Sequence, residues 1–144
     1  MKAVTLDFAM VASGADVTAT GKLHLFAAAF DTLEVQSLPT YIPPFALVIK
    51  LSGERGEGDA ANHSLSVTGV RVDGDKVALI EDFKFELPEP RHSDQFTTSA
   101  AFIFPIALKA TRFGKFQFLI SVDGQDLGTI PLWIVQSSEG LQDA

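Results

Sequence analysis

The densest group of chemically capable side chains lies in the stretch SGERGEGDAANHS, residues 52–64, which holds Glu54, Glu57, Asp59 and His63. Carboxylates and an imidazole at this spacing could bind a cation or exchange protons with a ligand. The stretch also contains three glycines, and this composition is equally typical of a solvated loop between strands. We interpret it as a loop, and as the place to look if the protein binds a cation or a basic partner.

Other signatures of catalysis and metal binding are weak. The chain has no cysteine and no G-x-S-x-G motif, and GERGEG at 53–58 lacks the Lys and Ser/Thr of a phosphate-binding loop. His63 and His92 have no second ligand at the spacing of a zinc site. The Asp-Gly pairs at 73–74 and 123–124 are what tight turns require. We therefore assign no catalytic residue, no metal and no cofactor, and a hydrolase-type enzyme is the least favoured function.

The bulk composition restricts the partners. A chain of 144 residues that is 47% hydrophobic can bury one core, and we expect a single domain over 1–137 followed by a tail at 138–144. The net charge of −7 disfavours nucleic acid and anionic membranes, because both bind clustered Lys and Arg. The first residues do not resemble an export signal, and together with the absence of cysteine this predicts a cytoplasmic protein.

Almost every apolar stretch alternates with a period of two residues, as a half-buried strand requires. In the first of them, Val4, Leu6, Phe8 and Met10 share one face. No segment shows the apolar spacing of an amphipathic helix. The pattern predicts eight strands, at 3–12, 21–30, 45–52, 63–72, 76–87, 96–108, 114–123 and 126–136.

Short strands separated by turn signals predict an all-β fold, namely a two-sheet antiparallel β-sandwich of immunoglobulin-like or Greek-key type. A closed β-barrel is the alternative. Each Asp-Gly pair predicts a hairpin. The apolar phase slips at 68–69 in SLSVTGVRV, which predicts a β-bulge there. We expect Phe8, Leu47, Phe118 and Ile120 to be buried in the core.

One outward face has the composition of an interface. In GTIPLWIV, Pro131 and Trp133 have the opposite phase to the apolar residues, and Leu119 has the same outward phase in the strand before. Proline donates no ladder hydrogen bond, so its strand should lie at an edge, or its nitrogen should face away from the partner strand. A large outward aromatic residue often belongs to a contact surface. Leu119, Pro131 and Trp133 are therefore the candidate interface of a homodimer or of a complex with another protein.

The loops suggest a second candidate site. Every second connection of an antiparallel sandwich lies at the same end, so we expect the loops at 12–21, 52–63, 87–95 and 123–126 to gather. Their crowded carboxylates would repel one another, and a bound cation would relieve this repulsion. The residues of this candidate cation- or ligand-binding rim are Asp16, Glu54, Glu57, Asp59, His63, His92, Asp94, Asp123 and Asp126.

Three stretches together resemble a known family: TLDFAMVASGADVTATGKLHLFAAAFDTL, PPFALVIKLSGERGEGDAANHSLSVTGVRVDGD and RFGKFQFLISVDGQDLGTIPLWIV. Their order, ending in a G-x-F-x-F-x-I-x-V-D-G hairpin, is similar to that of an uncharacterised prokaryotic family catalogued only as a domain of unknown function. The resemblance implies a small bacterial cytoplasmic β-sandwich, and it transfers no activity and no catalytic residue. The expected function is a non-catalytic binding or assembly module that self-associates. A cation- or small-ligand-binding sandwich is the alternative.

Overall fold

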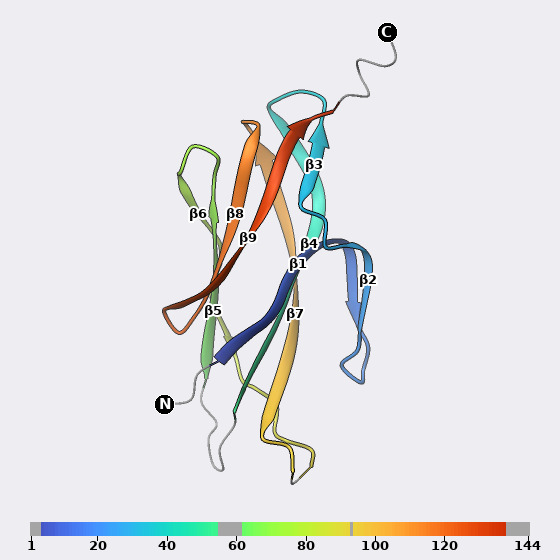
Figure 1. Cartoon of the computed structure of the whole chain (residues 1–144), viewed down its shortest axis with the longest axis vertical. Helices are drawn as coiled ribbons and strands as arrows, with labels where there is room; N and C mark the ends of the chain where they lie inside the picture. The colour runs from blue at the N-terminus through green and yellow to red at the C-terminus, as the bar shows by residue number, and fades with distance from the viewer. Residues whose placement is uncertain (1–3, 55–61, 93, 138–144) are drawn as a thin grey trace.

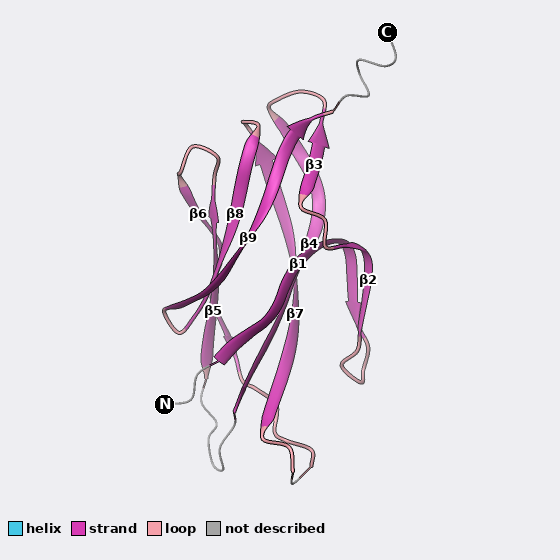
Figure 2. Ribbon diagram, viewed as in Figure 1, coloured by secondary structure: helices cyan, strands magenta, loops and turns pink. Residues whose placement is uncertain are grey.

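The protein is built from strands alone in the part of the chain that the structure, a computed structural model, describes: residues 4–54, 62–92 and 94–137. None of this part is a helix that could cross a membrane. The strands are β1 (Val4–Val17), β2 (Leu23–Ala28), β3 (Thr32–Val35), β4 (Thr40–Glu54), β5 (His63–Val70), β6 (Lys76–Phe85), β7 (Thr97–Ala110), β8 (Gly114–Val122) and β9 (Gln125–Gln136) (Figure 2).

The strands form two sheets, and neither sheet closes into a barrel. One has the order β2-β1-β4-β7 and the other the order β3-β9-β8-β5-β6 (Figure 1). Leu47, Ile49, Phe118 and Ile120 are fully buried between them, as alternating apolar residues on facing strands require. The predicted β-sandwich is confirmed, and the alternative of a closed barrel is wrong.

The hairpins agree with the Asp-Gly signals. The turn at 71–75 joins antiparallel β5 and β6, and the turn at 123–124 joins antiparallel β8 and β9. Gly74, Asp123 and Gly124 have φ values of 94°, 53° and 81°, a conformation that favours Gly and tolerates Asp. Both turns lie where the sequence predicts them.

The ninth strand was not predicted. β3 lies inside the predicted connection at 31–44, and it pairs in parallel with the last residues of β9. The sheets are therefore not wholly antiparallel. Four residues are too few to show a clear period in the sequence, so tertiary pairing decides this element.

A β-bulge near the start of β1 changes which residues reach the core. Leu6 pairs with Leu51 but Phe8 pairs with Lys50, so Asp7 is the extra residue. The inward phase therefore moves from Val4 and Leu6 to Ala9 and Val11. Phe8, predicted for the core, is half-buried on the outer face of the sheet instead.

The outer face of the four-stranded sheet carries a second apolar cluster, formed by Ala12, Ala46 and Val48. Beyond its pairing with β4, β1 turns back and pairs only with β2, as Figure 1 shows on the right of the view. We call residues 13–28 the arm. Leu23 and Leu25 of the arm pack against the second cluster and shield it from water.

The predicted bulge at 68–69 is wrong. β5 keeps an unbroken register with β8, and the two register shifts fall in its pairing with β6. Gly69 keeps the inward phase after Leu65 and Val67, but a Cβ there would lie 2.6 Å from the Phe116 ring. The apparent phase slip in the sequence thus marks an inward position that a neighbouring ring fills.

β9 is not an edge strand, but the nitrogen of Pro131 faces away from its partner strand β8, which is the second arrangement that the sequence allows. β3 pairs with β9 from Trp133 onward, and the Trp133 N–H donates to the Asp31 carbonyl at 2.7 Å. Residue 131 lies two positions earlier in β9, so its nitrogen points to the same side, at a level that β3 does not reach. Its missing N–H therefore leaves no partner unsatisfied in β3.

Candidate functional site

Two residues of the predicted rim meet in the structure. Asp123, in the β8–β9 turn, accepts a hydrogen bond from the Ser64 N–H at 2.9 Å, and its other oxygen lies 2.7 Å from Nδ1 of His63. The His63 ring also packs on Phe85, with 5.3 Å between the ring centroids. The left-handed backbone at Asp123 turns the carboxylate back onto the first residues of β5. This contact ties the β8–β9 hairpin to the beginning of β5.

These contacts affect the charge of the carboxyl group. Burial raises the pKa of Asp123, but the hydrogen bonds from His63 and Ser64 and the electrostatic interactions with His63 and Lys84 outweigh it. The pKa therefore lies below the ordinary value of 3.8, and the group is ionised at neutral pH. Because the Asp123 side chain is 47% exposed, the pair behaves as a surface contact.

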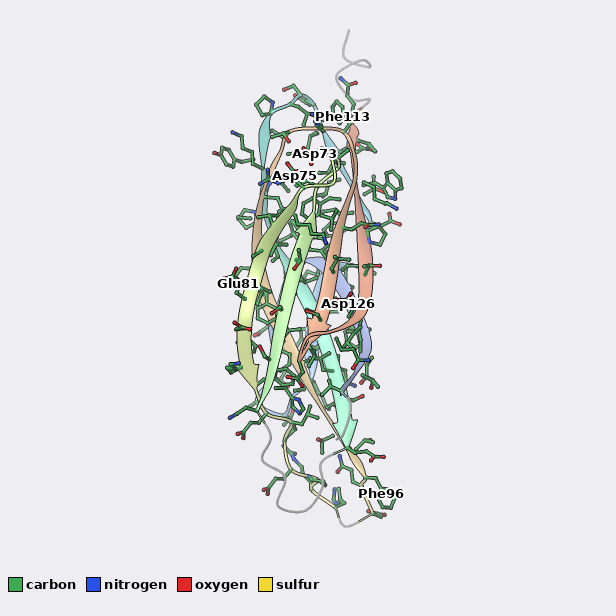
Figure 3. The ribbon with its side chains drawn as sticks, turned by 90° about the vertical axis from the view of Figure 1, so that its left-hand side faces the viewer. Asp73, Asp75, Glu81, Phe96, Phe113 and Asp126 are labelled. Carbon is green, nitrogen blue, oxygen red and sulfur yellow. The ribbon has the colours of Figure 1, made fainter. Side chains whose placement is uncertain are left out.

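The other rim residues that the structure describes lie on separate elements. Asp16 lies in the arm and accepts a hydrogen bond from the Val17 N–H at 2.9 Å. Glu54 ends β4, and His92 and Asp94 lie in the connection between β6 and β7. Figure 3, which faces the five-stranded sheet, shows Asp126 on β9 well above Phe96, at the lower end. Glu57 and Asp59 lie outside the described residues.

The described residues contain no group of three or more His, Asp or Glu that could hold a metal ion. His63 and Asp123 form a pair, and a third ligand of this kind does not join them within that part of the chain. The geometry favours a structural clip at this end of the sandwich.

A hollow that the sequence does not predict lies between the arm and the connection that precedes β7. It has a volume of about 390 Å³ and is lined by residues 18–21, Arg91, Gln95 and Thr98, among others. Thr98 is buried, and its hydroxyl oxygen has no hydrogen-bond partner in the described structure. The hollow exists because the arm folds back over the sheet, which no local signal in the sequence indicates.

The three residues of the candidate interface lie on the same outer face of the five-stranded sheet. The register places Thr68, Leu119 and Thr129 in one row across β5, β8 and β9. The next rows are Val70, Gln117 and Pro131, and then Lys115 and Trp133. Ser66, Ser121 and Asp126 form the row on the other side. We call these four rows the Leu119 face.

Charges on the Leu119 face are confined to its two outer rows. Lys115 occupies the row at one end and Asp126 the row at the other. Trp133 is 44% exposed, and the Lys115 ammonium lies 5.8 Å from the centre of its ring, which gives this corner a cation–π contact. The central rows carry hydroxyl, amide and apolar groups, which can be desolvated at far lower cost than charges.

Comparison with known proteins identifies relatives at the level of sequence family. A model described as a family of unknown function (DUF6941) matches residues 7–135, which includes all but the ends of the sandwich. No curated protein and no solved structure matches the chain.

Proposed function

The chain belongs to the DUF6941 family of unknown function. We propose that it is a non-catalytic binding or assembly module that self-associates. The surface proposed for this contact is the Leu119 face, and the partner is a second copy of the chain. The candidate interface residues Leu119, Pro131 and Trp133 take part in it.

The observation that supports the proposal most is the distribution of charge on this face. Interfaces are depleted of charged residues at their centre and enriched in aromatic residues, with a polar rim. The Leu119 face has this composition, with Leu119 at its centre, Trp133 at one corner, and Lys115 and Asp126 in its outer rows. A protein with a net charge of −7 repels its own copies, so a contact between copies requires a surface without excess carboxylates.

The Leu119 face is small. Three strands about 4.8 Å apart span about 14 Å, and seven residues along a strand span about 24 Å. Two such faces in contact remove roughly 700 Å² in total from water, which corresponds to a weak and reversible contact. In a two-fold dimer the same patch is present on both subunits, so one substitution acts twice.

The test is Trp133→Glu, studied by light scattering with size-exclusion chromatography. We expect the wild type to run at a multiple of the 15.5 kDa chain mass, and the variant to run at a lower mass with the same melting temperature within about 1–2 °C. The matched control is Tyr41→Glu, because Tyr41 is 77% exposed and lies at the beginning of β4, in the other sheet.

Three outcomes would contradict the proposal. The first is a wild type that stays monomeric at several hundred micromolar. The second is a Trp133→Glu variant with an unchanged mass. The third is a Tyr41→Glu variant that loses mass to the same extent, because the effect would then come from added charge in general.

A further inference from the structure

The four strands at the sheet edges differ in how well they are protected from pairing with another chain. The edges are β2 and β7 in one sheet and β3 and β6 in the other. β3 has four residues and β2 has six, and β6 has two register shifts and carries Lys76, Glu81, Asp82 and Lys84. Short length, bulges and charges are the usual means of preventing edge-to-edge pairing. These three edges are protected in this way.

β7 has none of these protections. It is 14 residues long, and residues 97–108, TTSAAFIFPIAL, contain no charged side chain. Its register with β4 is regular from Ile106 to Thr97. The described strands provide no partner on its other side. An edge of this kind is a template for another strand.

Two features limit the free edge to a short window. A proline inside a ladder is tolerated where its nitrogen faces away from the paired strand, so Pro105 and the other odd-numbered residues turn their backbone groups to the free side. The carbonyl oxygen of Thr97, which has the same parity, accepts a hydrogen bond from Nε2 of Gln95 at 3.0 Å. Between these limits, Ser99, Ala101 and Ile103 present N–H and C=O groups to the free side of the strand. We call residues 98–104 the window.

We propose that this window pairs with the same window of a second copy, antiparallel and centred on Ala101. The limits at Thr97 and Pro105 are symmetric about Ala101, so a two-fold axis there matches free donors with free acceptors over the whole window. Ser99 then faces Ile103 of the partner, and the two four-stranded sheets become one continuous sheet. Such a contact is isologous and closes on itself.

A second copy is the occupant that the charges favour. Each copy carries −7, and over residues 97–108 of β7 neither copy brings a carboxylate to the contact. Phe83 of β6 is 37% exposed beside this edge, with its ring centroid 5.4 Å from Phe102 and 5.1 Å from Phe104. Edge pairing would bring the partner strand against this partly exposed aromatic group. The pairing uses a different surface from the Leu119 face and does not depend on it.

The cysteine-free chain allows a direct test. In the proposed register, residue 101 faces the same residue of the partner as a hydrogen-bonded pair, with Cα atoms about 5.5 Å apart, which is within the range that a disulfide spans. We expect Ala101→Cys to form a covalent dimer under mild oxidation at micromolar concentration, and a mixture of Ser99→Cys with Ile103→Cys to form the heterodimer. Ala107→Cys is the matched control, because it lies on the same strand and face but beyond Pro105. It should cross-link at least tenfold more slowly.

A second variant tests the contact without a covalent bond. Ala101 pairs with Lys50 within the sheet, so Ala101→Glu gains a favourable neighbour in the folded chain while two glutamates meet across the two-fold axis. We expect it to lose the edge contact, whereas Ala107→Glu keeps it. Equal cross-linking at 101 and 107, or an Ala101→Glu variant whose mass by light scattering equals that of Ala107→Glu, would overturn the inference. A Trp133→Glu background tells the two contacts apart, because cross-linking at 101 should persist in it.

Discussion

The two outer faces of the sandwich differ in what covers them. On the four-stranded sheet, Ala12 and Val48 are completely buried although they point away from the shared core, because Leu23 and Leu25 of the arm lie over them. On the five-stranded sheet, Leu119 and Trp133 have no such cover in the described structure, and both remain partly accessible. Residues 13–28 thus cover one outer face, and the other outer face stays open in the described structure.

This difference shows how the composition of a face reflects its environment. The face under the arm is apolar, with Phe8, Met10 and Ile103 packed around the second cluster. The open face consists in its central rows of residues such as Thr68, Gln117 and Thr129, which water solvates easily and which a partner can also cover. The first composition fits permanent burial and the second fits a reversible contact.

The largest expected effect on stability comes from a substitution in the core between the two sheets. Phe118 is fully buried, and its ring contacts Phe45 and Phe116. Phe118→Ala removes a large apolar group and leaves a cavity, so we expect it to lower the free energy of unfolding by about 3–5 kcal/mol. Urea denaturation measures this. A loss below about 1 kcal/mol would show that the inward phase of β8 is wrong.

A matched pair of variants tests the difference between the covered and the open face. Val48→Ala deletes two buried methyl groups beneath the arm, and we expect a loss of about 2–3 kcal/mol in the free energy of unfolding. Leu119→Ala on the open face should cost less than about 1 kcal/mol in the isolated chain. Both are measured by urea denaturation at low protein concentration. Equal losses would mean that the two faces are equally buried.

Gly69 lies on the core-facing side of β5, whose opposite side belongs to the Leu119 face. A Cβ at this position would lie 2.6 Å from the Phe116 ring and 3.1 Å from Val77, so Gly69→Ala overpacks the core. We expect a loss of about 1–3 kcal/mol, measured by thermal denaturation. The control is Gly124→Ala, whose cost would come from its positive φ rather than from a clash, because nothing lies within 4 Å of a Cβ there. Phe116→Leu removes part of the ring that the new Cβ would meet. The cost of Gly69→Ala should therefore be smaller in a Phe116→Leu background than in the wild type, whereas the cost of Gly124→Ala should be the same in both.

The smallest expected effect concerns the clip at the end of the open face. The pKa of Asp123 is lowered in the folded protein, so its contribution is present above the unfolded pKa of about 3.9 and is lost as the pH falls through the folded value. Asp123→Asn should therefore reduce stability at pH 7 by less than about 1 kcal/mol. The difference from the wild type should shrink below pH 4. Melting curves from pH 3 to pH 7 measure it, and a difference that grows toward low pH would contradict this assignment.

The sequence predicts a large part of the fold. Alternation identified eight of the strands and most of the core, because a period of two residues is a direct consequence of the pleat. Asp-Gly identified both tight hairpins, because the turn requires positive φ values. Phe8 was misplaced because a one-residue bulge at Asp7 reverses the phase of everything after it. No local pattern distinguishes an outward apolar residue under an arm from an inward one.

The candidate sites also differ in how far the sequence predicts them. The outward phase of Leu119, Pro131 and Trp133 could be read from the sequence, because alternation fixes the side of a strand on which each residue lies. The pairing of His63 with Asp123, 60 residues apart, depends on which strands become neighbours. So does the position of β7 at an edge, since the uncharged residues 97–108 would suit a central strand equally well. The sequence by itself determined which residues are apolar, which turns are tight and, where no bulge intervenes, which residues of a strand share a face. Only the tertiary structure decided the order of the strands, the cover of each face and the open edge, because these depend on contacts between distant segments.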